Sequence, residues 1–198
     1  TLFPYTTLFR SGGAQGLSRG MAEGLLEAGC KVVIIDIKKE KVEEVCAEYR
    51  AKGLEAYSVV GDLSDRADLN RCFDEALEIL DGRLDVLIPA AGVTHRDLPE
   101  DYPESSWDFV INVNLNHVWF MIQRSLQVML KQPTGGKIIT IGSMASYFGC
   151  TAVTAYTAAK GAVAQLTKSV AVDCAGRGIN INCLCPGYMD TEMTAGMT

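Results

Sequence analysis

A serine, a tyrosine and a lysine in the second half of the chain have the residue types and spacing of a proton-transfer site. Tyr156 and Lys160 are four residues apart at the start of an alanine-rich stretch with a helical pattern, and Ser143 follows the strand-like run KIITIG. Residues four apart on a helix are neighbours, roughly 6 Å from one another. A nearby cation favours the ionised form of a phenol, whose ordinary pKa is about 10. We therefore expect Tyr156 to accept a proton near neutral pH, with Ser143 orienting the oxygen that releases it.

The spacing of the tyrosine and the lysine is weak evidence by itself. With seven tyrosines in 198 residues, a Tyr-x-x-x-Lys match arises by chance roughly 0.3 times. Its weight depends on whether the other segments of the chain form elements that place these residues beside a substrate.

Composition and charge exclude several classes of protein. A chain of 198 residues, 48% hydrophobic and 21% charged, fits one globular domain with a sizeable core. The net charge of −6 is spread without a basic stripe, which argues against a nucleic-acid surface. No apolar run approaches about 20 residues, so we expect no membrane partner.

The cysteines indicate a reducing compartment. There are seven of them, scattered without metal-ligand spacing, so we expect no metal site and reduced thiols in the cytoplasm. The closest pair, Cys183-Leu184-Cys185, is best interpreted as small apolar residues at the end of a strand.

The beginning of the chain is unusual. The first eleven residues, TLFPYTTLFRS, resemble one translated frame of a DNA-sequencing adapter, so we expect 1–11 to be foreign and 12–198 to be the domain. They lack the basic start, apolar core and cleavage site of a signal peptide. The β-prone residues from Tyr5 to Phe9 could still be recruited as a strand, although Arg10 would then stand where a buried apolar residue belongs.

From residue 12 onward, helical and strand patterns alternate. Apolar runs predict strands at 31–36, 55–60, 84–88, 137–141 and 179–184, and helical periodicity predicts helices at 17–29, 40–49, 65–80, 107–130 and 154–174. The strand runs are apolar rather than alternating, which indicates a parallel sheet covered by helices on both faces. We predict an α/β fold, a doubly wound, Rossmann-like sheet in a single domain.

The glycines before the first helix could bind a phosphate group. Gly12, Gly13 and Gly16 leave bare backbone beside the N–H groups of a helix start, where a pyrophosphate can approach closely. An ordinary turn is the alternative. Asp36, 24 residues after Gly12, ends the next strand, where a carboxylate would bind an adenosine ribose and repel a 2′-phosphate. We therefore predict NAD rather than NADP as the cofactor.

Five separated motifs give the chain, from Ser11 to Thr198, a resemblance to the short-chain dehydrogenase/reductase family. They are the glycine turn, Gly61-Asp62-Leu63, the Asn-Val-Asn of residues 112–114, Ser143 with Tyr156 and Lys160, and Pro186-Gly187 with Thr191. The resemblance implies reversible hydride transfer between C4 of a nicotinamide and a secondary alcohol or ketone.

The resemblance also implies a role for each matching residue. Tyr156 would be the acid/base on the substrate oxygen, Lys160 would bind the nicotinamide ribose and lower the pKa of the phenol, and Ser143 would hold the substrate oxygen. Asn114 would position a water for proton relay; alone it would be interpreted as a helix-bend or capping residue. Asp62 would border the adenine, and it could also cap the helix that follows. The cofactor-binding set implied by the resemblance is Gly12, Gln15, Gly16, Leu17, Asp36, Asp62, Leu63, Ala91, Gly92, Tyr156, Lys160, Pro186, Gly187, Tyr188 and Thr191.

The chain departs from the family pattern in four places. Ser18 replaces the third glycine of the turn, and we expect cofactor binding to survive its small hydroxyl. Pro89-Ala90-Ala91-Gly92 replaces Asn-Asn-Ala-Gly, so a backbone donor and two side-chain amides are lost from the cofactor loop. The adapter-like residues replace the first strand, and the chain stops at Thr198, before the family's last helix and last strand. These losses put the activity of this shortened chain in question.

The substrate is less well defined by the sequence. KIITIGSMASYFG and CPGYMDTEM resemble the branch of the family that oxidises sugar acids, such as the gluconate and deoxygluconate dehydrogenases. Arg96 could pair with a substrate carboxylate, although a solvated loop arginine is the alternative. His95 as an additional acid/base is a weaker hypothesis. Reduction of 3-oxoacyl chains is another activity of the family, usually with NADP, which Asp36 disfavours.

Two further hypotheses concern activity and assembly. A catalytically silent NAD-binding protein of the same fold is an alternative from another class, but the complete Ser143, Tyr156 and Lys160 set argues against it. The predicted helices at 107–130 and 154–174 carry apolar residues on more than one face, so we expect a homo-oligomer, a tetramer by resemblance.

Overall fold

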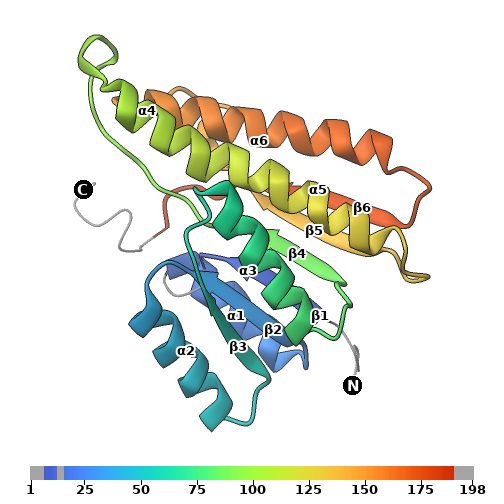
Figure 1. The fold of residues 1–198 in the computed structure, drawn as a ribbon. Helices are drawn as coiled ribbons and strands as arrows, with labels where there is room; N and C mark the ends of the chain where they lie inside the picture. Colours follow the sequence, from blue (N-terminus) through green and yellow to red (C-terminus); the bar gives the residue numbers. More distant parts are fainter. Residues whose placement is uncertain (1–6, 13–15, 190–198) are drawn as a thin grey trace.

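The computed structural model describes residues 7–12 and 16–189, within which six parallel strands form one sheet (Figure 1). The strands are β1 (Thr7–Ser11), β2 (Lys31–Asp36), β3 (Ala56–Val60), β4 (Val86–Pro89), β5 (Gly136–Ile141) and β6 (Ile179–Leu184). Their spatial order is β3-β2-β1-β4-β5-β6. This order reverses between β1 and β4, and doubly wound sheets bind ligands in the crevice at such a reversal. The predicted α/β, Rossmann-like class is confirmed.

Helices cover the two faces of the sheet. They are α1 (Gly16–Glu27), α2 (Lys39–Ala51), α3 (Arg66–Ile79), α4 (Glu104–Ile111), α5 (His117–Met129) and α6 (Thr154–Asp173). The pair α1 and α2 packs on one face, whereas α3, α5 and α6 pack on the other (Figure 1). No helix within the described ranges is long and apolar enough to cross a membrane.

Strand β2 is apolar throughout because both of its faces are covered. Successive side chains of a strand point to opposite faces. Val33 and Ile35 belong to the core cluster that includes α3, α5 and α6, whereas Val32 and Ile34 belong to the cluster that includes α1 and α2. All four side chains are fully buried, and each contributes roughly 1.5–3 kcal/mol of transfer free energy.

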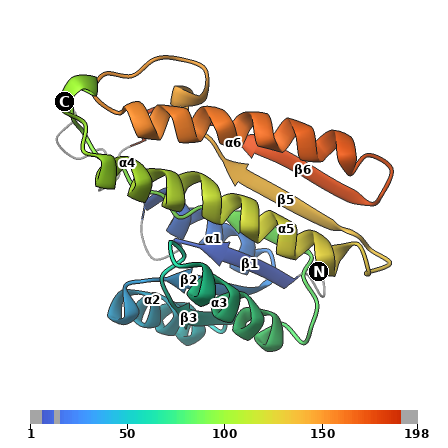
Figure 2. The same cartoon turned by 45° about the horizontal axis from the view of Figure 1, so that its top comes forward.

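The helix predicted at 107–130 is a single helical column (Figure 2), and it contains a wide turn. It begins three residues early, at Glu104, directly after Pro103. A π-helical segment, η2 (Asn112–Asn116), joins α4 to α5. Such a segment widens the helix by one residue per turn and is often found at functional sites. Helix α4 lies beside α6, and α5 lies on β4 and β5.

Strand β6 is the exception to the predicted apolar runs. Ile179 and Ile181 are buried against the helices of one face, but Asn180 and Asn182 are exposed on the other. The alternation shows that within the described residues only one face of this edge strand is covered. Its position, from Ile179 to Leu184, is the one that the sequence predicts.

The adapter-like residues supply the central strand. Thr7–Ser11 form β1, which pairs in parallel with both β2 and β4, slightly later than the β-prone run at 5–9. Thr7 is anchored because its N–H donates to Asp85 Oδ2 at 2.9 Å and its hydroxyl donates to Arg83 O at 2.9 Å. Burial raises the pKa of Asp85, but hydrogen bonds from Arg83 and Thr7 outweigh burial and lower it. The foreign origin of 1–11 stays a prediction, and residues 1–6 lie outside the described part of the chain.

Candidate active site

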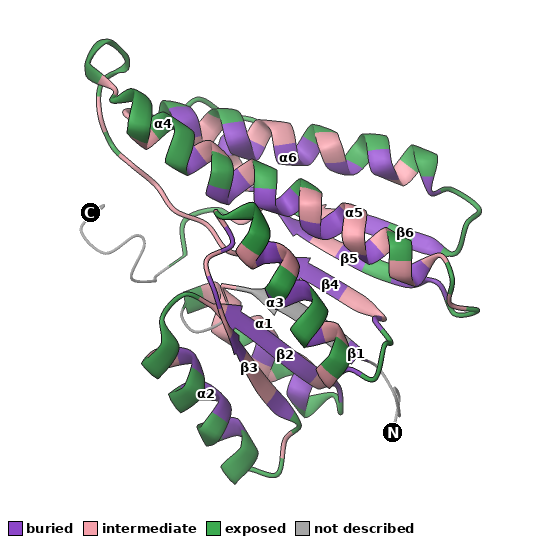
Figure 3. Cartoon of the chain, in the orientation of Figure 1, coloured by how far each residue is buried: buried purple, intermediate pink, exposed green. Residues whose placement is uncertain are grey.

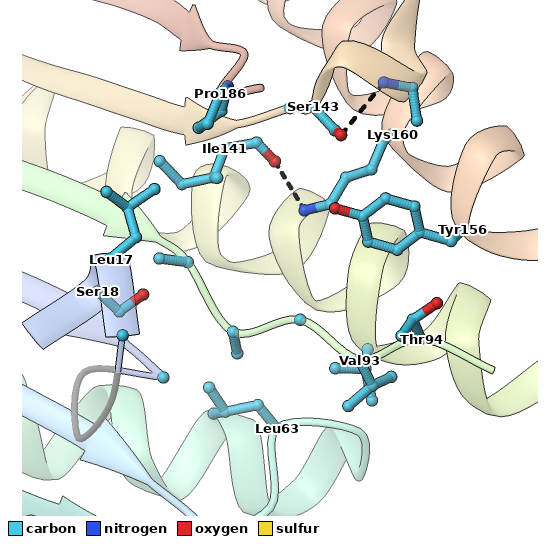
Figure 4. Close-up of a pocket in the computed structure, with 18 of the residues that line it drawn as sticks. Leu17, Ser18, Leu63, Val93, Thr94, Ile141, Ser143, Tyr156, Lys160 and Pro186 are labelled. Carbon is cyan, nitrogen blue, oxygen red and sulfur yellow. Dashed lines mark hydrogen bonds between the residues drawn. The ribbon is translucent and has the colours of Figure 1, made fainter. Parts of the chain in front are cut away.

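A cavity of about 500 Å³ opens at the carboxyl ends of the strands, where the strand order reverses. Leu17, Ser18 and Leu63 line one side, whereas Ser143, Tyr156 and Lys160 line the other (Figure 4). The predicted residues that line it are Gly12, Gly16, Leu17, Asp36, Asp62, Leu63, Ala91, Gly92, Arg96, Ser143, Tyr156, Lys160, Pro186, Gly187 and Tyr188. The sequence therefore identified groups from seven different segments that the fold brings to one place.

Lys160 is a buried cation at the floor of the cavity. It is 4% exposed, and its Nζ donates to Ile141 O at 2.8 Å (Figure 4). Ser146 Oγ donates to the backbone carbonyl of Lys160 at 2.7 Å, which fixes this turn of α6 to the end of β5. Burial lowers the pKa of Lys160 to about 8, because desolvation disfavours the charged form.

Tyr156 lies one helical turn before Lys160, as the spacing predicts. The Lys160 Nζ is 5.6 Å from the centre of the Tyr156 ring. Burial raises the pKa of Tyr156, and the hydrogen bond with Ser143 offsets that rise only in part. The structure therefore contradicts the expected direction of the Tyr156 pKa shift. Desolvation of the buried ring is the largest cause, and the sequence does not show how deeply the ring is buried.

Ser143 is held by a turn directly after β5. It precedes a short 3-10 helix, η3 (Met144–Ser146), and its Oγ accepts a hydrogen bond from Ala145 N at 3.2 Å. Ser143 N in turn donates to Ser146 Oγ at 3.1 Å, which completes a reciprocal cap. Ser146 thus holds both Ser143 and the turn that carries Lys160. Sequence reasoning missed it, although Ser-x-x-Ser after a strand is a capping signal.

Asn114 lies in the π-helical turn and clamps the loop after β4. Its side-chain oxygen accepts from Val93 N at 3.0 Å, and its side-chain nitrogen donates to Val93 O at 2.7 Å. A Cβ added to Gly92 would stand 2.9 Å from Asn114 Oδ1 and 3.8 Å from Lys160 Nζ. Gly92 therefore keeps open the space between the asparagine and the lysine. Asn114 itself is fully buried and does not line the cavity.

The glycine turn approaches the loop after β4 very closely. Gly12 has a φ of +67°, its N–H donates to Ile35 O at 2.8 Å, and a Cβ there would stand 2.7 Å from Ala91 Cα. Gly16, with a φ of +54°, begins α1. A side chain at Gly12 would push the two loops apart, so this turn provides the bare backbone that a phosphate needs. The predicted residue Gln15 lies outside the described residues.

Two aspartates border the other side of the cavity. Asp36 ends β2 and accepts a hydrogen bond from Lys38 N at 3.1 Å. Asp62 accepts from Ser64 N at 2.8 Å and from Ser64 Oγ at 2.7 Å. The N-cap of α3 is Asp65, so the prediction that Asp62 caps this helix is wrong. Its carboxylate instead closes a tight turn of three residues, from Asp62 to Ser64.

Comparison with known proteins fits this geometry. The sequence profile of the family described as "short chain dehydrogenase" matches residues 8–198. The chain belongs to the short-chain dehydrogenases.

Relatives of this short-chain dehydrogenase include enzymes that act on sugar acids. The 2-dehydro-3-deoxy-D-gluconate 5-dehydrogenase of Dickeya dadantii is 39% identical over 90% of this chain and 70% of its own length. The structure of a gluconate 5-dehydrogenase from Burkholderia cenocepacia, in complex with NADP and tartrate, is 33% identical. It superposes with a TM-score of 0.88 over 96% of this chain and 73% of that one.

Another solved relative is a 3-ketoacyl-(acyl-carrier-protein) reductase from Brucella melitensis complexed with NADH. It is 26% identical, with a TM-score of 0.91 over 98% of this chain and 79% of that one. This short-chain dehydrogenase is thus an oxidoreductase that acts on CH–OH groups of a small molecule with a nicotinamide cofactor.

The structure separates Arg96 and His95, two of the residues predicted to contact substrate in this short-chain dehydrogenase. Arg96 is exposed and lines the cavity. His95 does not line it, because its ring packs edge-on against Tyr102 at 5.3 Å between ring centres. The sequence analysis assigned no role to other cavity residues, such as Thr94, Cys150 and Val153. The predicted residue Thr191 lies outside the described residues.

Proposed function

We propose that the chain is an NAD-dependent dehydrogenase that converts a secondary alcohol of a sugar acid to the ketone, or the reverse. The observation that carries the proposal is that Arg96 lines the same cavity as Ser143 and Tyr156. A guanidinium binds a carboxylate through two parallel hydrogen bonds, so it would orient an acid whose alcohol faces the tyrosine. The sugar-acid dehydrogenases among the relatives, one of them in complex with tartrate, support this substrate class. A neutral polyol is the nearest alternative.

The side chains have separate tasks in the proposed reaction. When bound, the nicotinamide accepts or supplies the hydride. Tyr156 exchanges a proton with the substrate oxygen, and Ser143 donates a hydrogen bond to hold that oxygen. The ammonium of Lys160 has three N–H donors and gives one to Ile141 O, which leaves two for ribose hydroxyls. Its positive charge favours the phenolate form of Tyr156, which burial of the ring disfavours.

Asn114 would hold a relay water through its backbone. Its side-chain amide is engaged on both sides by Val93. A water that passes protons between Lys160 and solvent would therefore bind the Asn114 carbonyl, and the amide would keep the loop after β4 in place.

The choice of NAD over NADP rests on Asp36. Its carboxylate lies at the end of β2 and lines the cavity, where it would bind the adenosine ribose hydroxyls and repel a 2′-phosphate. Lys38 lines the same end of the cavity, and its positive charge opposes the repulsion of a 2′-phosphate by Asp36. One solved relative contains NADP and another NADH, so the carboxylate of this chain carries the proposal.

The proposed enzyme is a cytoplasmic homo-oligomer, a tetramer by resemblance. All seven thiols are free, which fits a reducing compartment. Three apolar side chains are exposed on the helices α4, α5 and α6, namely Trp107, Trp119 and Val172. Buried and exposed residues alternate along these helices (Figure 3). Such side chains on packed helices suit a contact with another subunit. A single monomer peak in light-scattering chromatography would overturn this part of the proposal.

A substrate panel tests the proposed function. The absorbance of NADH at 340 nm is followed with sugar acids, with neutral polyols of equal length and with a 3-oxoacyl thioester. We expect turnover with a sugar acid, and about a tenfold or greater rise in KM for Arg96→Gln with that acid alone. Turnover of the thioester alone favours the 3-oxoacyl reductase alternative. NADH binding without any turnover favours the silent NAD-binding protein.

A further inference from the structure

One buried titratable side chain is not used in the proposed reaction. His117 is the first residue of α5, one helical turn after Val113 and three residues after Asn114. It is 1% exposed. A histidine without access to solvent must either be satisfied by partners or be costly to the fold, so its contacts indicate its task.

The contacts of His117 follow from the wide turn. In an α-helix its backbone N–H would donate to the carbonyl four residues earlier, on Val113. Here that N–H donates to Asn112 O, five residues earlier, because η2 is a π-helical turn. The imidazole Nδ1 of the same residue contacts Val113 O. A carbonyl oxygen can only accept, so Nδ1 carries the hydrogen. The Val113 carbonyl thus receives its hydrogen bond from the ring of His117 and not from the backbone N–H of the same residue.

The ring is suited to this task because it stays neutral. Burial lowers the pKa of His117 to about 4, and the positive charge of Lys160 acts in the same direction, against the hydrogen bond to Val113. At neutral pH the ring is a fixed donor and not an acid. It therefore holds the turn without placing a second cation beside Lys160.

The turn held in this way carries Asn114. Asn114 follows Val113 directly and reaches across to Val93 with both atoms of its amide. Val113 and Val93 line the cavity, and the space above Gly92 separates Asn114 from Lys160. A shift of the Val113 carbonyl would therefore move the asparagine relative to the lysine.

We infer that His117 is a positioning residue whose Nδ1–H holds the π-helical turn and so aims Asn114 at Val93, beside Lys160. The inference rests on the proposed function, since it assigns His117 to the same site. It does not make His117 an acid or a base in the reaction.

Three substitutions separate this role from simple packing. The amide nitrogen of asparagine can take the place of Nδ1, whereas that of glutamine takes the place of Nε2, and leucine has no donor. We expect His117→Asn to keep kcat within about threefold, and His117→Gln and His117→Leu to lower it about tenfold or more. The melting temperatures and the KM for substrate should differ little. Combined with Asn114→Ala, His117→Leu should add almost nothing, because both act through one group.

The opposite results overturn the inference. Equal kcat values for the His117→Asn and His117→Gln variants would contradict it, and so would an unchanged kcat in a folded His117→Leu protein. A double variant whose loss of kcat is the sum of the losses from His117→Leu and Asn114→Ala, on a free-energy scale, would also contradict it. If the wild-type chain turns over no substrate, the proposed function fails while the placement of His117 is still testable.

The protonation of the His117 ring is tested by NMR, without substrate. The chain has only two histidines, so ¹⁵N NMR with a His95→Asn variant assigns both. We expect the His117 ring to stay in its Nδ1–H form from about pH 5 to 9. Titration of the His117 ring near pH 6.5 would contradict this assignment.

Discussion

The ends of β1–β3 and the ends of β4–β6 line one cavity, but they hold their functional groups by different means. On the first side the two aspartates make short-range contacts: Asp36 binds the backbone of Lys38, and Asp62 binds Ser64. On the second side the contacts join distant elements, as between Lys160 and Ile141, which are 19 residues apart. The two acidic side chains of the cofactor side are therefore oriented by local turns, whereas Lys160 on the catalytic side is oriented only in the complete fold.

The catalytic side should show the largest effect on activity. Tyr156→Phe removes the group that exchanges the proton and should lower kcat by about 10²–10⁴-fold, with little change in NADH affinity. Steady-state rates and fluorescence titration of NADH measure the two effects. Tyr147→Phe is the matched control, because Tyr147 is 63% exposed and does not line the cavity. Similar rates for both variants would remove Tyr156 from the reaction.

On the cofactor side, Asp36→Ala should change cofactor preference without disrupting the fold. Loss of the carboxylate removes both a ribose acceptor and the repulsion of a 2′-phosphate, so the ratio of NAD to NADP affinity should fall about 10- to 100-fold. Titration of both cofactors at fixed ionic strength measures the ratio. Asp81→Ala is the control, since Asp81 is exposed and does not line the cavity. An unchanged ratio would show that Asp36 does not select the cofactor.

The buried Lys160 should make stability depend on pH in a defined window. Its pKa falls from 10.5 to about 8 on folding, so between these values the unfolded chain binds more protons than the folded one. Stability contributed by this group therefore rises as pH increases from about 8 to 10.5. Relative to Lys160→Met, the wild-type unfolding free energy should increase by about 1–3 kcal/mol across the window. The exposed Lys168→Met is the control, and parallel curves for wild type and Lys160→Met would contradict the burial effect.

A pair of serine substitutions compares long-range with local contacts directly. Ser146 donates to Lys160 O, 14 residues away, and accepts from Ser143 N, whereas Ser64 donates to Asp62, two residues away. We expect Ser146→Ala to lower the unfolding free energy by about 1–3 kcal/mol and Ser64→Ala by about 0.5–1 kcal/mol. Urea unfolding of both variants measures the difference. Equal losses would show that the two sides are held alike.

The sequence predicted the elements well where a signal is local. The apolar runs gave every described strand after residue 30, and the helices from α2 to α6 lie within a few residues of their expected ranges. Strand β6 departs from the predicted apolar pattern, because a strand that is covered on one face only alternates between apolar and polar side chains. The π-helical turn at Asn114 was not predicted, since no residue pattern distinguishes it from ordinary helix.

The site was less predictable where burial decides the chemistry. The spacing of Tyr156 and Lys160 was confirmed, but the direction of the Tyr156 pKa was not, because desolvation comes from surrounding elements. Asp62, Ser64 and Asp65 are all capping types, and only the backbone shows that Asp65 caps α3. Arg96 and His95 are neighbours in sequence, yet only the arginine lines the cavity.

The sequence by itself determined the order of strands and helices, the glycine turn, and a serine, tyrosine and lysine at fixed spacing. These features depend on backbone freedom, side-chain periodicity and residue type, all of which act over a few residues. The tertiary structure alone decided which groups are desolvated and which carbonyl each donor meets. The contacts of Lys160 with Ile141 and of Asn114 with Val93 depend on how the helical column, α6 and the strand ends pack together.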